Sequence, residues 1–323
     1  MGIDAALRYW GLDGSVASFG DGYINDTFLV GSRFVVQRVN ERVFPNAEAL
    51  MRNVSRVADA LGELGIHPLR VPDRTNPYRV PDGSLWRVSP YVKGRCFRQV
   101  PEELVEPAGE AFGTLLNRLA ACDVSLEPAV PGYHDIDHYL AIHDTLEQDA
   151  ETKPEREFVE VQRHRVPDYS TGEQIIHGDC KVDNLIFHPR SPRVLKIVDL
   201  DTLMQGHPAF DFGDFVRSAC TSVGNAEWQS MMKRGKSAIA GFFRPFRLPF
   251  RAVRVSESMA LAPAHMSFML GLRFLNDHCQ GDRYFKVRRR GENLERARAQ
   301  FRLCEAFRTG VPDLSRWIED ALD

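Results

Sequence analysis

The segment His177-Gly-Asp-Cys-Lys-Val-Asp-Asn184 constrains this chain more than any other part of its sequence. Apolar residues on both sides of the segment predict two short strands, and a third predicted strand at 195–198 ends directly before Asp199. A loop between strands can therefore bring Asp179 and Asn184 together with Asp199 at one site.

These three side chains match the needs of phosphoryl transfer. The transferring group is loosely bonded in the transition state, so catalysis depends on positioning and charge neutralisation. We expect Asp179 to orient an acceptor hydroxyl and take its proton, and Asn184 and Asp199 to hold Mg²⁺ against phosphates. The alternative is a hairpin in which these residues only build turns. His177 is expected to fix the loop by hydrogen bonds to the backbone.

The order of predicted elements indicates an α+β fold with two lobes. A helix at 1–11 precedes three strands, a long helix from Asn46 to Gly65 and two further strands before position 92. After a link at 89–94, most of the chain is predicted to be helical. We therefore predict a protein-kinase-like arrangement. Its N-lobe, 1–90, carries a small antiparallel sheet and one long helix, and its C-lobe, 91–323, is mostly helical.

Composition narrows the setting in which such a chain works. The 323 residues suffice for two modest domains, and a net charge of −3 creates no basic field for nucleic acid or an anionic membrane. No apolar run is long enough to span a bilayer, and the N-terminus lacks the layout of a secretory signal. The six scattered cysteines favour free thiols in a reducing cytoplasm, where we expect the protein. The oligomeric state stays open.

The HGD....N segment, followed by Asp199-Leu-Asp201, resembles the aminoglycoside phosphotransferase and choline kinase superfamily. Further stretches are similar to its N-acetylhexosamine 1-kinase branch, at 20–28, 36–40, 198–204, 210–214, 271–277, 281–287 and 293–301. The resemblance implies a kinase that uses ATP and Mg²⁺ to phosphorylate the anomeric hydroxyl of a hexosamine. It also implies that Asp179 is the base, that Tyr91 lies beside the adenine, and that Asp201 lies near the metal or the substrate.

The expected nucleotide side departs from the usual kinase pattern. The turn at Gly20-Asp-Gly22 lies where a kinase covers the phosphates, but it can equally be a plain hairpin turn. Asn25 stands in the third glycine position and could contact a phosphate. The third strand has no lysine, so either Gln37 or Arg38 takes that position. The superfamily pattern favours Gln37, whereas charge favours Arg38, with Glu48 as the nearest partner.

Two features indicate an acceptor side. Arg273 lies in an apolar helix, where a charge needs a partner or a ligand. It either binds a sugar oxygen or a phosphate, or it pairs with Asp277 four residues further on. His134 and Asp135 also fit the hexosamine-kinase pattern, and they either reach the substrate or build a turn and a helix cap.

Three functions remain open at this stage. The first is a sugar 1-kinase, and the second is a kinase of aminoglycosides or other amino alcohols. An acidic cleft would favour the cationic acceptor, whereas a cleft containing arginine would favour a neutral sugar. The third is a pseudokinase that binds nucleotide or a partner without chemistry, which the missing lysine suggests.

Overall fold

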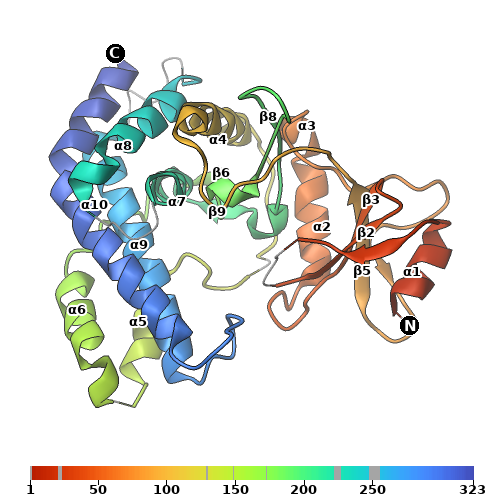
Figure 1. Ribbon diagram of the computed structural model, residues 1–323, viewed down its shortest axis with the longest axis horizontal. Coiled ribbons are helices and arrows are strands. Elements are labelled where there is room, and N and C mark those ends of the chain that lie inside the picture. The colour runs from red at the N-terminus through yellow and green to blue at the C-terminus, as the bar shows by residue number, and fades with distance from the viewer. Residues whose placement is uncertain are drawn as a thin grey trace.

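The computed structural model describes residues 2–20, 24–128, 130–147, 149–171, 173–221, 227–246 and 255–323. The chain forms two lobes, with a five-stranded sheet in one and most of the helices in the other (Figure 1). The predicted two-lobed α+β architecture is therefore confirmed. None of the helices in the described ranges is long and apolar enough to cross a membrane.

The N-lobe sheet is antiparallel throughout, with strand order β1-β2-β3-β5-β4. Alternation along β3 sends Val36 into the core against α1, and leaves Val35 and Gln37 on the opposite face. That opposite face is the one turned to the C-lobe. The elements are α1 (Gly2–Trp10), β1 (Val16–Ser18), β2 (Asp26–Val30), β3 (Phe34–Arg38), β4 (Tyr78–Arg79) and β5 (Leu85–Pro90).

The helix predicted from Asn46 to Gly65 is interrupted, so the expectation of one continuous helix is wrong. It forms α2 (Ala47–Arg56) and the short α3 (Ala58–Leu61). The backbone leaves helical values at Val57, with φ −104° and ψ 10°, and that side chain is buried in the core. Tertiary packing of Val57 thus overrides the helical pattern of the sequence at this position.

The C-lobe is built on closely packed helices. Helices α4 and α8 touch through glycines: a Cβ on Gly113 would lie 2.0 Å from the Phe242 carbonyl oxygen. The long helices α9 and α10 pack side by side (Figure 1). The helices are α4 (Val105–Ala120), α5 (Ile136–Asp144), α6 (Lys153–Arg163), α7 (Pro208–Cys220), α8 (Trp228–Phe243), α9 (Val255–Cys279) and α10 (Glu292–Leu322).

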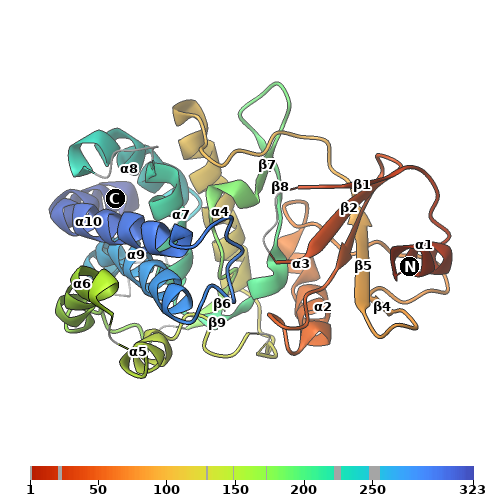
Figure 2. The same ribbon diagram turned by 60° about the horizontal axis from the view of Figure 1, so that its bottom comes forward.

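Two small hairpin-like sheets carry the loop singled out by the sequence. The predicted strands are present as β6 (Gln174–Ile176), β7 (Leu185–Phe187) and β8 (Val194–Ile197). Strand β7 pairs with β8, and β6 pairs with β9 (Met204–Gly206), which the sequence pattern did not predict. Figure 2 shows β7 and β8 between the helices of the C-lobe and the N-lobe sheet. The segment 177–184 is therefore held between the two lobes.

Candidate active site

One cavity of about 1100 Å³ lies between the lobes and gathers most of the predicted site residues. Gly22 is outside the described residues, and Arg38 does not line the cavity. The other predicted residues all line it: Gly20, Asn25, Gln37, Tyr91, His134, Asp179, Asn184, Asp199, Asp201 and Arg273.

The loop before Asp179 is fixed by buried polar contacts. The Nε2 of His177 contacts the Val198 carbonyl oxygen at 3.1 Å, and its Nδ1 accepts from the Asp179 amide at 3.2 Å. The structural role expected of His177 is therefore confirmed. Asp211, from the first turn of α7, accepts the amides of His177 and Gly178 at 2.8 and 2.7 Å. Sequence reasoning missed Asp211, although Phe-Asp-Phe-Gly was one of the stretches that carried the resemblance.

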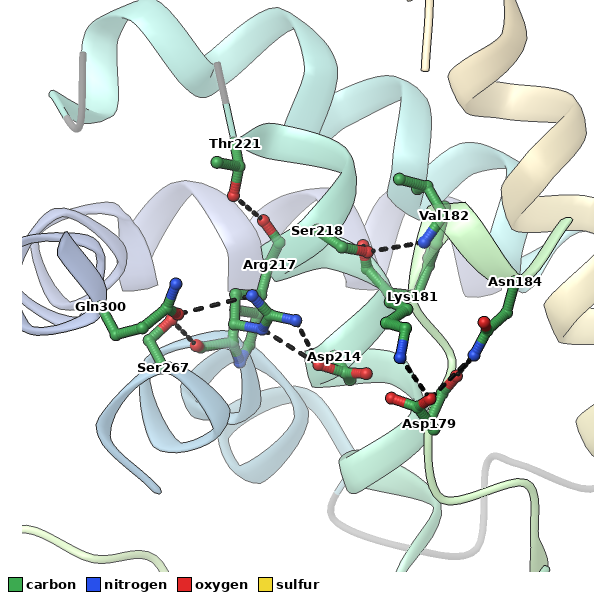
Figure 3. A network of polar contacts seen from close by, with 12 residues as sticks. Asp179, Lys181, Val182, Asn184, Asp214, Arg217, Ser218, Thr221, Ser267 and Gln300 are labelled. Atoms are coloured by element: carbon green, nitrogen blue, oxygen red, sulfur yellow. Dashed lines mark hydrogen bonds and ion pairs between the residues drawn. The ribbon is translucent and has the colours of Figure 1, made fainter. Parts of the chain in front are cut away.

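Asp179 is bound on one of its two carboxylate oxygens. Lys181 Nζ lies 2.6 Å from Oδ2, and Asn184 Nδ2 donates to the same oxygen at 2.8 Å (Figure 3). Oδ1 accepts no hydrogen bond from the described residues. Burial raises the pKa of Asp179, but the charge and hydrogen bond of Lys181, with smaller contributions from His177 and Asn184, together outweigh burial and leave the pKa below its usual value. The carboxylate is thus ionised and has one oxygen available to a hydroxyl.

Asn184 and Asp199 provide the oxygen ligands that Mg²⁺ prefers. The Asn184 amide nitrogen is turned to Asp179, so its Oδ1 accepts nothing from the described residues. Burial, followed by the nearby charge of Asp201, raises the pKa of Asp199 to about 6. A divalent cation would relieve this crowding of negative charge. No three His, Cys, Asp or Glu side chains in the described ranges cluster as a metal site.

The N-lobe wall of the cavity settles where the two candidate replacements for the strand lysine lie. Gln37 faces the cavity and donates to Thr27 Oγ1 at 3.1 Å. Arg38 points to the other face of the sheet, where its side chain is about half exposed and pairs with Asp26. The expected Arg38–Glu48 pair is wrong, because Glu48 pairs with Arg79 on the surface.

Sequence reasoning missed the arginine that lies in this wall. Arg87 on β5 lies opposite Gln37 on β3, and its Nε donates to Gln37 Oε1 at 2.9 Å. Its two terminal nitrogens donate to the carboxylate of Asp201, one of them at 2.9 Å. Asp201 also accepts from Asn25 Nδ2 at 3.0 Å, so it links β5 and the residue before β2 to the C-lobe. A strand pattern alone could not reveal which neighbour Arg87 would face.

Tyr91 lines the cavity where the sheet joins the C-lobe. Its ring lies edge-on to Phe19, with centroids 5.6 Å apart, and its amide donates to the Arg33 carbonyl oxygen at 2.8 Å. Pro90, the last residue of β5, also lines this end of the cavity. This apolar end has the character expected of a pocket for a flat ring.

Arg273 lies in the opposite wall inside a cage of aromatic rings. Its guanidinium carbon is 4.9 to 5.6 Å from four ring centroids, those of Tyr133, Tyr139, Tyr284 and Phe285. No carboxylate of the described residues lies within ion-pair distance. Burial lowers the pKa of Arg273, but the tyrosines outweigh burial, so the group stays charged.

The expected pairing of Arg273 with Asp277 is wrong, because Asp277 is engaged by the loop between α9 and α10. Its carboxylate accepts the amides of Arg283 and Tyr284 at 2.8 Å and that of Phe285 at 2.9 Å. Asn293 also donates to it at 2.9 Å. Asp277 thus shapes the loop that carries two rings of the cage.

His134 is buried beside the catalytic loop, with Nε2 2.7 Å from the Gly178 carbonyl oxygen. Burial lowers its pKa to about 4, so it is neutral and donates from Nε2, which leaves Nδ1 without a partner among the described residues. Asp135 caps α5 by accepting from the His138 amide, as the turn-and-cap alternative predicted.

A polar network extends from the catalytic loop along α7 (Figure 3). Ser218 Oγ accepts the Val182 amide at 3.1 Å and so ties the loop to the helix. The preceding residue, Arg217, donates to Asp214 one turn earlier at 2.7 and 3.0 Å and to Gln300 of α10 at 3.4 Å. Asp214, Arg217, Ser218 and Gln300 line the cavity.

The family model of the phosphotransferase enzyme family matches residues 15–245, which include the sheet, the catalytic loop and α7. The chain belongs to this family. As a phosphotransferase it matches the broad superfamily that the catalytic motif resembled, whereas the hexosamine-kinase branch remains a proposal. The probable acyl-CoA dehydrogenase IBR3 of Arabidopsis thaliana is 30% identical over 227 residues, 61% of this chain and 27% of that protein. The phosphotransferase therefore spans about a quarter of that relative.

Solved structures show the same fold at low identity. The GDP and kanamycin complex of APH(2")-IIIa has a TM-score of 0.62 at 14% identity, covering 95% of this chain and 98% of that one. A choline/ethanolamine kinase family protein from Mesorhizobium loti has a TM-score of 0.59 at 18% identity, covering 99% of both chains. The predicted protein-kinase-like arrangement of the phosphotransferase is thereby confirmed.

Proposed function

We propose that the protein is an ATP- and Mg²⁺-dependent kinase that phosphorylates the anomeric hydroxyl of an N-acetylhexosamine or a related sugar. The observation that carries the phosphotransfer is the state of Asp179 in the cavity. Its carboxylate is ionised, one oxygen is held by Lys181 and Asn184, and the other is open.

The transfer follows from these contacts. The open oxygen of Asp179 accepts a hydrogen bond from the acceptor hydroxyl. It takes the hydroxyl proton as the hydroxyl oxygen of the acceptor attacks the γ-phosphorus. The bond to the bridging oxygen breaks, and ADP leaves. Asn184 and Asp199 would hold Mg²⁺, which supplies charge neutralisation on the phosphates when bound. Lys181 keeps Asp179 ionised until it receives the proton.

The acceptor end supports a neutral sugar over a cationic one. Helices α7, α9 and α10 contribute three arginines to the described cavity wall, Arg217, Arg273 and Arg296, but one carboxylate, Asp214. That carboxylate is already bound by Arg217. Such a wall repels the ammonium groups of an aminoglycoside or another amino alcohol. The rings around Arg273 offer flat apolar faces, and its guanidinium offers donors to hydroxyl or acyl oxygens.

A screen of acceptors tests the proposal by ADP release. N-acetylglucosamine and N-acetylgalactosamine are compared with glucosamine, kanamycin and choline, each with ATP and Mg²⁺. We expect turnover with an N-acetylated sugar, and a product that loses its reducing end because the anomeric oxygen carries the phosphate. Turnover with kanamycin or choline alone would replace the sugar by the amino-alcohol alternative. ADP or ATP binding without turnover of any acceptor would favour the pseudokinase.

A further inference from the structure

Arg87 places a cation of the N-lobe sheet in the wall of the cavity. In the described part of the sheet, it is the one lysine or arginine among the residues that line the cavity. Strand β3 supplies an amide, Gln37, and directs its own arginine to the surface. The β3–β5 register places Arg87 directly across from Gln37. A positive charge thus enters the cavity one strand over from the expected position.

We infer that Arg87 binds the phosphates of the nucleotide in place of a strand lysine, with Asp201 as the carboxylate that aims it. This inference rests on the proposed function, because it takes a nucleoside triphosphate to be the donor. It assigns a role to a residue outside the catalytic loop and outside β3.

The hydrogen bonds of Arg87 leave it able to bind a further anion. A guanidinium has five N–H donors, and three are used here, one on Gln37 and two on Asp201. Two donors remain, one on each terminal nitrogen, and each can donate a single charged hydrogen bond to a phosphate oxygen. Arg87 can therefore contact a phosphate without leaving Asp201.

The surroundings fix the direction of the side chain. Asp201 is 2% exposed and the side chain of Arg87 is 14% exposed, so neither group moves freely in water. Asn25, just before β2, donates a hydrogen bond to the Asp201 carboxylate, and Gln37 on β3 accepts one from Arg87. Asp199, the proposed metal ligand, adds to the negative field that keeps Arg87 charged. Phosphates held near Asp199 would lie within the field of this arginine.

Calorimetric titration with ADP and with adenosine, both without divalent cations, tests this role apart from turnover. Asp201→Asn is the reference, and Asp201→Asn with Arg87→Met removes the arginine without leaving a buried carboxylate unpaired. We expect the double variant to bind ADP at least about tenfold more weakly than the reference, because charged hydrogen bonds are lost, and adenosine equally well. Arg87→Lys in the otherwise unchanged chain should lose less affinity for ADP than Arg87→Met.

The control is Arg38→Met, which removes the neighbouring arginine on the outer face and should leave ADP binding unchanged. Equal ADP affinity in the double variant and its reference would overturn the role of Arg87 in phosphate binding but would leave the proposed function standing. A matching loss of adenosine affinity would overturn it too, because the effect would then be structural. If the unchanged protein binds neither ADP nor ATP, the proposed function itself fails. Thermal unfolding of each variant confirms that it is folded.

Discussion

Lys181 and Asp179 form an ion pair within the catalytic loop, with Nζ 2.6 Å from Oδ2. The two residues are two positions apart in the sequence, so no other element is needed to bring them together. Both line the cavity. Its consequence is an asymmetric carboxylate, in which one oxygen is bound and the other accepts no hydrogen bond from the described residues.

Replacing Asp179 with Asn should lower kcat by about 10²- to 10⁴-fold, the usual contribution of a general base. Shape and the contact with Asn184 are largely kept, so ADP affinity should stay the same. Steady-state kinetics and calorimetry measure the two quantities on one preparation. Retention of most of the turnover would remove Asp179 from the mechanism, and Asp144→Asn on the surface is the control.

Replacing Arg273 with Met should raise the KM of the acceptor by about 10- to 100-fold, since charged hydrogen bonds to the sugar are lost. ADP affinity should not change, because Arg273 lies on the acceptor wall. Arg289→Met, in the connection that follows α9 and exposed on the surface, is the control. An unchanged acceptor KM would show that the aromatic cage binds Arg273 for stability alone.

Buried histidine makes the protein lose stability in mild acid. His265 is 2% exposed, neither ring nitrogen has a partner among the described residues, and burial lowers its pKa from 6.5 to about 3. Below pH 6.5, therefore, His265 is protonated in the unfolded chain but stays neutral in the folded chain. The free energy of unfolding should fall by about 1.4 kcal/mol per pH unit from this group as pH drops from 6.5.

His265→Phe tests that origin. The variant should be as stable as the unchanged protein at pH 8, since no hydrogen bond is lost, and its stability should fall less steeply between pH 6.5 and 4.5. Urea unfolding at several pH values gives both slopes. Parallel slopes for the two proteins would assign the acid sensitivity to other groups, among them His134.

Two glycines of α8 should respond to alanine with opposite signs. A Cβ on Gly241 would lie 2.1 Å from the Glu106 carbonyl oxygen of α4, so Gly241→Ala must push the helices apart and should cost about 1–3 kcal/mol. At Gly235 the nearest atom is 3.4 Å away, and Gly235→Ala should stabilise by about 0.5–1 kcal/mol through helix propensity. Thermal unfolding measures both. Similar effects of the two changes would contradict the close contact of α4 and α8.

The residues that sequence reasoning found are those whose neighbours lie close in the chain. Asp179, Asn184 and Asp199 share one loop and one strand end, so spacing alone brings them together. Arg87 and Asp211 were missed because their partners come from strand register and from helix packing. Period-two alternation did separate Gln37 from Arg38 onto two faces, but only the folded sheet shows which face is the cavity.

The break at Val57 and the strand β9 were missed for a related reason. A helical pattern continues through Val57, and the interruption depends on packing. Met204-Gln-Gly206 has no strand pattern of its own and becomes a strand by pairing with β6. Arg273 was singled out correctly as a charge in an apolar helix, yet its i+4 partner was misassigned because Asp277 binds backbone amides instead.

The carboxylate of Asp277 has a consequence for how such kinases diverge. It holds the main chain of residues 283–285, so the path of that loop does not depend on which side chains stand at Tyr284 and Phe285. Those two positions can therefore change while the backbone keeps its course. We expect a library randomised at 284 and 285 to yield folded proteins with altered acceptor preference, which makes this short loop a place where new substrates can be acquired by few mutations.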